Sequence, residues 1–236
     1  MITSGAPKYS ANKTEVVDVV SGETCADLPE FPVPNDGAVG ANVNGTPVVC
    51  GGVDSAGFSS KCYRFKNGKW KEFASMKEPR WQAAGVMYKK EFHVFGGYGP
   101  KHTSEIISID GGVEYGPDLP EAVSFHAITS INSMVSLLSG GMTNTNDNSP
   151  LTWYFNHETN VFTSGPSLTE GRRTHGSATI VDKVTKAKIP TVTGGYGKAG
   201  TLDSTEMLID GQWQSGTIQF VEFPQFLSNH LFFVAV

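Results

Sequence analysis

The sequence predicts an all-β fold of repeated four-stranded sheets, and three observations lead to it. An apolar strand that runs into a glycine doublet occurs four times, with doublets beginning at Gly51, Gly96, Gly140 and Gly194. The steps between them are 45, 44 and 54 residues, and a period in this range marks a repeat protein. Short alternating segments and tight turns fill each step, and no helical periodicity appears. Four short strands at this period are typical of the blades of a β-propeller; the coils of a β-solenoid, the alternative, are usually shorter.

The composition fits this architecture and excludes some functions. The 236 residues suit one all-β domain, residues 1–236, with repeat boundaries near 51, 96, 140 and 194. Charged residues are 17% of the chain, and 27 Gly and 13 Pro supply turns. The net charge of −5 argues against nucleic acid as a partner, because phosphate binding needs a basic face. We expect a monomer without a membrane span.

The expected strands up to the second doublet are, in order, residues 1–5, 15–20, 24–26, 38–43, 46–50, 61–65, 69–73, 82–88 and 91–95. Two Asn-Gly pairs, Asn44-Gly45 and Asn67-Gly68, are strong hairpin signals because both positions of such a turn need positive φ. Each of these strands is therefore joined to its neighbour by a short turn.

The same order continues to the end of the chain. The connection at residues 182–188 is enlarged and accounts for most of the 54-residue step. The expected strands are residues 105–109, 113–115, 126–131, 134–139, 151–155, 161–163, 175–181, 189–193, 204–209, 212–215 and 230–236.

The units resemble the kelch repeat, in which a glycine doublet is followed by an aromatic residue and then by a Trp. Tyr63 and Trp70 match this pattern after the first doublet, and Phe155 and Phe162 match it after the third. Trp213 follows the fourth doublet. The resemblance implies structural roles, close backbone approach for the glycines and packing between blades for the aromatic rings. These residues are Gly51, Gly52, Tyr63, Trp70, Gly96, Gly97, Gly140, Gly141, Phe162, Gly194, Gly195 and Trp213.

The order of strands in a kelch blade also implies how the ring closes. Such blades run from an inner strand to the doublet strand, a third strand and an outer strand. By this order the chain begins in a doublet strand and ends on an inner strand, residues 230–236. The C-terminal strand then completes the N-terminal blade and the propeller has five blades. The alternative is a fragment of a six- or seven-bladed propeller.

Three cysteines bear on the compartment. Cys50 and Cys62 flank the first doublet and lie opposite each other if the strands pair antiparallel, which permits a disulfide. The alternative is that both, like Cys25, are free thiols in half-buried strands. Asn12-Lys13-Thr14 and Asn44-Gly45-Thr46 are acceptors for N-glycosylation if the chain is exported. No signal peptide pattern appears at the N-terminus, so the compartment stays open between cytoplasm and secretion.

The loops that follow each doublet and those that precede each inner strand are expected to share one face. Binding residues concentrate in loops on a rigid scaffold, and Arg, Tyr and Trp are enriched at interface hot spots. We therefore expect a protein or peptide partner to bind this face, without a cofactor. The candidate binding residues are Arg80, Trp81, Tyr98, His102, Asn146, Arg172, Arg173 and Tyr196.

Polar residues at the starts of the expected inner strands raise the alternative of a metal ring. They are Gln82, His126, His175 and His230. Inner strands of separate blades are too far apart for three imidazoles to reach one ion at about 2.1 Å, so we expect no metal there. Instead, these side chains are expected to bond to loops of neighbouring blades.

Catalytic signatures are missing from the sequence. It contains no Gly-x-Ser-x-Gly, no Cys-x-x-Cys and no His-Glu-x-x-His. The sequence therefore favours a non-catalytic protein-interaction module. The alternative is a carbohydrate- or metal-dependent enzyme on a kelch scaffold, and fold alone does not decide between them.

Overall fold

A computed structural model describes the chain at residues 2–3, 12, 14–17, 24–25, 28–99, 101–182 and 184–216. Every helix or strand in these ranges is a β-strand, so the fold is all-β. The described residues contain no helix long and apolar enough to cross a membrane. The expected strand at residues 230–236 lies outside the described ranges.

Four antiparallel sheets of four strands each make up most of the molecule, and we number them second to fifth in chain order. The second sheet holds β4 (Val39–Val43), β5 (Thr46–Cys50), β8 (Lys61–Lys66) and β9 (Lys69–Ser75). The third holds β10 (Ala84–Tyr88), β11 (Glu91–Phe95), β12 (Ser104–Ser108) and β13 (Val113–Tyr115). The fourth holds β14 (Ala127–Ser130), β15 (Val135–Ser139), β16 (Thr152–Asn156) and β17 (Val161–Ser164). The fifth holds β18 (Gly176–Val181), β19 (Lys188–Thr193), β22 (Thr205–Ile209) and β23 (Gln212–Gly216).

The remaining strands form smaller sheets. The first sheet pairs β1 (Ile2–Thr3), β2 (Thr14–Val17) and β3 (Thr24–Cys25) in that order. Two short hairpins, which the sequence analysis had assigned to loops, follow the first and fourth doublets. They are β6 (Val53–Asp54) with β7 (Gly57–Phe58), and β20 (Tyr196–Gly197) with β21 (Gly200–Thr201).

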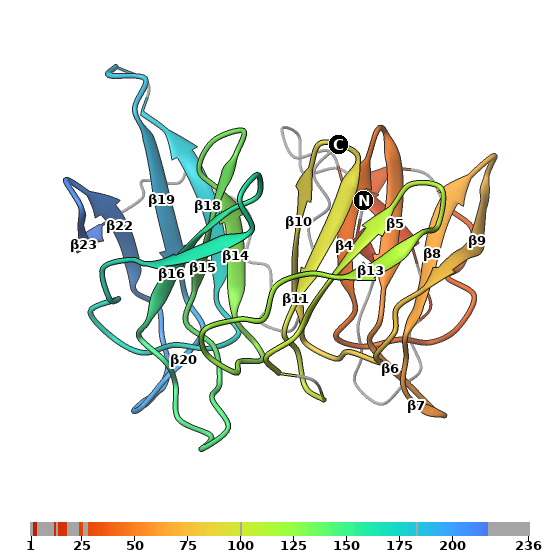
Figure 1. Cartoon of the computed structure of the whole chain (residues 1–236), viewed down its shortest axis with the longest axis horizontal. Helices are drawn as coiled ribbons and strands as arrows, with labels where there is room; N and C mark the ends of the chain where they lie inside the picture. Colours follow the sequence, from red (N-terminus) through yellow and green to blue (C-terminus); the bar gives the residue numbers. More distant parts are fainter. Residues whose placement is uncertain are drawn as a thin grey trace.

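The sheets stand side by side in chain order, in a propeller-like arrangement. The first strand of each of the second to fifth sheets faces inward, where β10 contacts both β4 and β14, and β14 contacts β18 (Figure 1). Outer strands β9 and β23 lie at opposite flanks of the view. Hairpins β6–β7 and β20–β21 project at the lower end, which we call the loop face.

The glycine doublets join neighbouring sheets at the loop face. All eight doublet glycines have positive φ, between 58° and 107°. The amide N–H of Gly52 donates to the carbonyl of Arg80 at 2.7 Å, and that of Gly141 donates to the carbonyl of Arg172 at 2.8 Å. A Cβ on Gly140 would lie 2.4 Å from the same Arg172 oxygen. Only glycine fits this close approach, which explains the repeated doublets.

A second set of backbone hydrogen bonds links the starts of the inner strands. Gly37, Gln82, Phe125 and Thr174 occupy equivalent positions, and all four have φ between 56° and 63°. The N–H of Gln82 donates to the Gly37 carbonyl, that of Phe125 to Gln82, and that of Thr174 to Phe125, at 2.8–2.9 Å. Three links of main chain thus tie the second to fifth sheets together around the inner strands.

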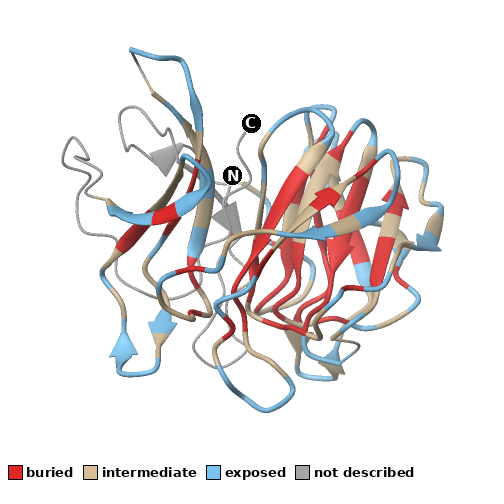
Figure 2. Ribbon diagram, turned by 60° about the vertical axis from the view of Figure 1, so that its left-hand side comes forward, coloured by how far each residue is buried: buried red, intermediate tan, exposed pale blue. Residues whose placement is uncertain are grey.

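Apolar side chains fill the spaces between sheets. Val48, Phe92 and Val94 are fully buried between the second and third sheets, and Phe155 is fully buried in the cluster that also holds Phe95 (Figure 2). The expected structural aromatic residues pack in these layers. The Trp70 ring, for example, contacts Phe31 at a centroid distance of 5.1 Å and donates from Nε1 to the Thr14 hydroxyl.

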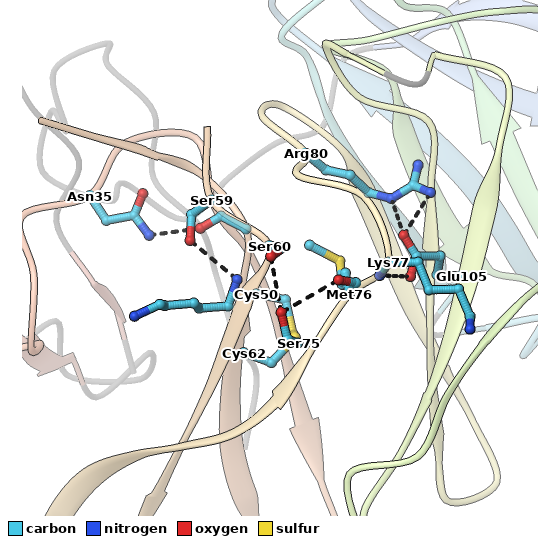
Figure 3. Close-up of a disulfide and its surroundings, with 12 residues drawn as sticks. Asn35, Cys50, Ser59, Ser60, Cys62, Ser75, Met76, Lys77, Arg80 and Glu105 are labelled. Carbon is cyan, nitrogen blue, oxygen red and sulfur yellow. Dashed lines mark hydrogen bonds and ion pairs between the residues drawn. A yellow bond between two sulfur atoms is a disulfide. The ribbon is translucent and has the colours of Figure 1, made fainter. Parts of the chain in front are cut away.

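Cys50 and Cys62 form a disulfide, the pairing that the sequence analysis considered. The two residues lie opposite each other on β5 and β8, and their sulfur atoms are 2.08 Å apart (Figure 3). Both are fully buried in the cluster between the second and third sheets. The bond closes the loop that carries the β6–β7 hairpin, so it fixes the base of that hairpin.

Candidate functional site

Main-chain bridges hold two positions at the loop end of each of the second to fifth sheets. In each sheet an isolated backbone bridge joins the third residue before the inner strand to the residue after the doublet. The bridged pairs are Asp36 with Val53, Trp81 with Tyr98, Ser124 with Met142, and Arg173 with Tyr196. Because the main chain holds these positions fixed, the chemistry of the face is set by the side chains placed on them.

Aromatic residues gather at one of these bridges. Trp81 stacks on Phe58 at a centroid distance of 6.0 Å and an interplanar angle of 12°. Its ring also meets Tyr98 at 5.8 Å and Phe125 at 5.2 Å, both nearly edge to face. Phe58 and Tyr98 keep 44% and 40% of their surface exposed. We call Phe58, Trp81, Tyr98 and Phe125 the aromatic cluster.

Cations flank the exposed tyrosines of the loop face. The Lys101 ammonium lies 5.0 Å from the centre of the Tyr98 ring and donates to the Thr143 carbonyl. The Arg173 guanidinium lies 5.9 Å from the ring of Tyr196, which is 45% exposed, and donates to Asn148 Oδ1 at 2.9 Å. The face therefore offers aromatic rings beside positive charge at the third and fifth sheets, on either side of the fourth.

Two candidate binding residues, Arg80 and Arg172, are corrected by the structure. Their exposed fractions are 1% and 0%. Nη2 of Arg80 lies 3.0 Å from Glu105 Oε1, and its Nη1 donates to the Gly96 carbonyl at 2.8 Å (Figure 3). Both arginines turn inward to a carboxylate on the third strand of their own sheet, so neither can contact a partner through its guanidinium.

Arg172 makes the equivalent contacts in the fifth sheet. Its guanidinium pairs with Glu206 and donates to the carbonyls of Gly194 and Ser204 at 3.0 and 3.1 Å. Glu206 also accepts from the Thr169 amide at 2.7 Å. Arg172 and Arg173 therefore cannot act together on a partner, because Arg172 points to the interior and Arg173 to the face.

Of the other candidate residues, four form two contacting pairs and two stand apart in loops. Trp81 and Tyr98 meet each other, and Arg173 meets Tyr196, as described above. His102 is exposed in the loop after the second doublet. Asn146 is exposed in the loop after the third doublet, where its φ of 63° shapes the turn. Neither side chain makes a hydrogen bond within the described part of the chain. Phe58, which sequence reasoning missed, was detectable as an aromatic residue in a turn-rich loop.

A cavity of about 330 Å³ lies among the inner strands behind the loop face. Its lining includes Gln82, Phe125 and Thr174, and also His126 and His175. The described lining residues include no Asp, Glu, Lys or Arg. The two histidines occupy equivalent positions, and in the third sheet that position is Ala83, so Gln82 does not belong with them.

Both cavity histidines are held neutral. Burial, together with the nearby Arg80, lowers the pKa of His126 to about 3. Burial also lowers the pKa of His175 to about 3, with contributions from Arg172 and His126. His175 Nε2 bonds at 3.0 Å to Ser139 Oγ, which lies on strand β15 of the neighbouring sheet and not in a loop, where such a partner was expected. His126 has no hydrogen-bond partner within the described residues.

A second histidine pair joins the third and fourth sheets at their other end. The Nδ1 atoms of His93 and His157 lie 3.3 Å apart. His157 Nε2 is 2.9 Å from Ser136 Oγ, and burial lowers the pKa of both histidines to about 4. Across the described residues, no group of three or more His, Cys, Asp or Glu side chains is arranged to hold a metal ion.

Comparisons with known proteins establish the fold and nothing finer. No family model matches the chain, and no curated protein matches its sequence. Among solved structures, one described as "Structure of YjhT" superposes with a TM-score of 0.74 at 12% sequence identity. The match covers 87% of this chain and 78% of that one. At this identity the likeness shows a shared fold alone.

Proposed function

We propose that this chain is a kelch-type propeller that binds a partner protein through its loop face and has no catalysis of its own. The observation that carries the proposal is the aromatic cluster at that face. Two of its rings, Phe58 and Tyr98, are each at least 40% exposed, whereas aromatic residues within the sheets, such as Phe92 and Phe155, are buried. Exposed aromatic rings held by a rigid backbone lose little conformational entropy when a partner covers them.

The surroundings of the cluster also support a protein partner. Trp81 contacts Phe125 below it and Phe58 and Tyr98 at the surface, so the rings support one another before binding. A preorganised surface needs less ordering on association, which raises affinity. The Lys101 ammonium over Tyr98 adds a positive charge at the rim, where it can steer a partner with acidic groups.

The test compares captured partners between variants. Phe58→Ala with Tyr98→Ala removes the exposed part of the cluster and leaves Trp81 against Phe125. Tyr115→Ala is a matched control, because Tyr115 is 54% exposed but lies on outer strand β13, away from the cluster. After chemical cross-linking and quantitative mass spectrometry, partners held by the wild type should be lost from the double variant and kept by the control. Retention by a folded double variant would overturn the proposal.

We also propose that the propeller closes with five blades, with residues 230–236 as the inner strand of the first sheet. The first sheet has three described strands in the order β1, β2, β3, which lacks an inner strand next to β1. In the sequence, His230 stands where His126 and His175 stand in their sheets. Thermal unfolding should be one cooperative transition that is lost when residues 231–236 are removed. A broad transition unaffected by the truncation would instead favour a fragment of a larger propeller.

A further inference from the structure

The hairpin between β4 and β5 carries an acceptor sequence for a modification that the proposed function does not involve. We propose that Asn44 is a site of N-linked glycosylation, and that the chain matures in an oxidising secretory compartment. The inference stands on three observations: the geometry of the Asn44-Gly45-Thr46 turn, the contrasting state of Asn12, and the disulfide of the same sheet. It does not depend on the proposed protein partner.

The turn presents Asn44 to solvent. Asn44 and Gly45 have φ of 51° and 76°, the two left-handed positions of a two-residue hairpin turn, and both are exposed. Thr46 pairs with Val43 across the start of the hairpin. The Asn44 carboxamide makes no hydrogen bond within the described ranges. An oligosaccharide on this side chain therefore displaces no contact and enters no packed surface.

The other acceptor sequence is in a different state. Nδ2 of Asn12, the atom that a glycan would occupy, donates to Glu30 Oε2 at 2.8 Å. The hydroxyl of Thr14, the third residue of that acceptor, is buried and accepts from Trp70 Nε1 at 3.1 Å. A glycan on Asn12 would stand next to the packing around Trp70. We therefore assign Asn44, and not Asn12, as the modified residue.

The disulfide supports the compartment that this chemistry requires. Disulfides persist where the environment is oxidising, as in secreted proteins and the lumen of the secretory pathway. Cys50 lies at the end of β5, the strand that begins at Thr46. One cysteine of the disulfide and the glycosylation acceptor sequence therefore belong to the same hairpin. One compartment therefore accounts for two features of the second sheet.

The position of Asn44 keeps a glycan away from the aromatic cluster. The turn precedes β5, whereas Gly51-Gly52 and the β6–β7 hairpin follow it at the loop face. Five strand residues separate the two ends, about 17 Å at the usual rise per residue. A glycan at the turn would shield one end of the second sheet and leave the loop face open.

The transfer balances without an oxidant. Nδ2 of Asn44 attacks the anomeric carbon of an oligosaccharide carried on a polyprenyl pyrophosphate. A carbon–nitrogen bond forms, the bond from that carbon to the phosphate oxygen breaks, and the lipid pyrophosphate leaves with the electron pair. One Nδ2 proton passes to the transferring enzyme or to solvent. The hydroxyl of the third residue, here Thr46, is what acceptor recognition requires.

The test expresses residues 1–236 behind a secretory leader in eukaryotic cells. Amidase release of a glycan converts its asparagine to aspartate, so peptide mass spectrometry of the wild-type protein reads the site directly. We expect Asp at position 44 after release. Asn44→Gln and Thr46→Val should each lose one glycan by gel mobility, and Asn12→Gln should retain it. An unmodified Asn44 in secreted wild-type protein would overturn the proposal, whatever the folding of the variants.

A matched turn in the same sheet tests the geometric argument. Asn67-Gly68 has φ of 54° and 70° and is equally exposed, but Lys69 follows it in place of Thr. Lys69→Thr completes an acceptor sequence on the same type of turn. We expect this variant to carry one glycan more than the wild type. If Lys69→Thr gained a glycan while Asn44 had none, turn geometry would not explain the choice and the assignment of Asn44 would fail.

Discussion

The third and fourth sheets fill the same buried positions at their loop ends with different side chains, charged in one and apolar in the other. Beneath the doublet of the third sheet, buried Arg80 pairs with Glu105. In the fourth sheet, Val123 stands in the place of the arginine and Trp153 in the place of the glutamate, opposite Leu138 on the doublet strand. Val123 belongs to an apolar cluster against which Trp153 packs. One sheet therefore closes its loop end with an ion pair and its neighbour with apolar contact.

The backbone around the two pairs is nevertheless the same. The carbonyl of Arg80 accepts from Gly52, and the carbonyl of Val123 accepts from Gly97 at 3.1 Å. The frame is thus made of main chain, and the side-chain pair beneath it can differ from sheet to sheet. We expect the two side chains of a pair to be replaceable only together, because a buried charge without its partner costs several kcal/mol. The predictions below probe this rule, from the largest effect to the smallest.

Removing one member of the ion pair should have the largest effect. Glu105→Ala removes the buried carboxylate from the Arg80 guanidinium, which keeps a contact of 3.3 Å with the partly exposed Glu78, and it also removes the acceptor for the Lys77 amide. We expect the free energy of unfolding to fall by about 3–5 kcal/mol in urea titrations. The double variant Arg80→Val with Glu105→Trp, which copies the fourth sheet, should be more stable than Glu105→Ala alone. Equal stability of the two variants would show that the sheets are not interchangeable here.

The disulfide gives the second comparison, between the second and fifth sheets. Cys50 and Cys62 occupy the positions that Thr193 and Thr205 occupy in the fifth sheet, where the two hydroxyls lie 2.8 Å apart. Replacing both cysteines by Ser should cost about 2–4 kcal/mol, chiefly through the less restricted unfolded chain. Replacing both by Thr should cost less, because it copies the fifth sheet. Urea titration of the two variants in parallel checks the order.

The buried histidines give a pH dependence that differs between sheets. The folded pKa of His126 and His175, about 3, lies below the ordinary value of 6.5, so the unfolded chain binds more protons between these limits. Stability is fully present above pH 6.5 and falls as the pH is lowered toward 3, on the order of 1–2 kcal/mol per histidine by pH 5. His126→Ala with His175→Ala, which copies the third sheet, should make the decline from pH 7 to 5 shallower. It should not abolish the decline, because His93 and His157 also have pKa values lowered to about 4. His102→Ala, at an exposed position, should leave it unchanged.

An exposed ion pair should show the smallest effect. Lys61 and Glu72 lie 3.3 Å apart on the second sheet, with about half of each side chain exposed. Solvent and salt screen such pairs, so Glu72→Ala should leave the unfolding midpoint unchanged within error. A loss approaching that of Glu105→Ala would show that burial is not what separates the two pairs.

Local patterns in the sequence were enough to predict the strands of the second to fifth sheets and the tight turns, but not the short hairpins β6–β7 and β20–β21. Asn-Gly pairs and glycine doublets act over a few residues, so their structure follows from their own neighbourhood. The role of Arg80 was not accessible in this way, because its partner Glu105 is 25 residues away and on the third strand of the sheet. In hindsight the sequence contains a repeated pattern. Arg80 and Glu105 flank the second doublet, and Arg172 and Glu206 flank the fourth.

Candidate surface residues were harder to predict than scaffold residues. Arg80 and Trp81 are adjacent in the sequence, yet one points inward and the other joins the aromatic cluster. The residue after a doublet and the residue before an inner strand meet only through the backbone bridge between their loops. Such pairing depends on how the doublet approaches the next sheet, which no local pattern reveals.

The links between inner strands also bear on the order in which the protein assembles. In each link the later residue donates to a carbonyl made earlier: Gln82 to Gly37, Phe125 to Gln82 and Thr174 to Phe125. A sheet leaving the ribosome therefore finds its acceptor in the sheet synthesised just before it. The second to fifth sheets can dock one at a time from the N-terminal side, without waiting for the chain to be complete.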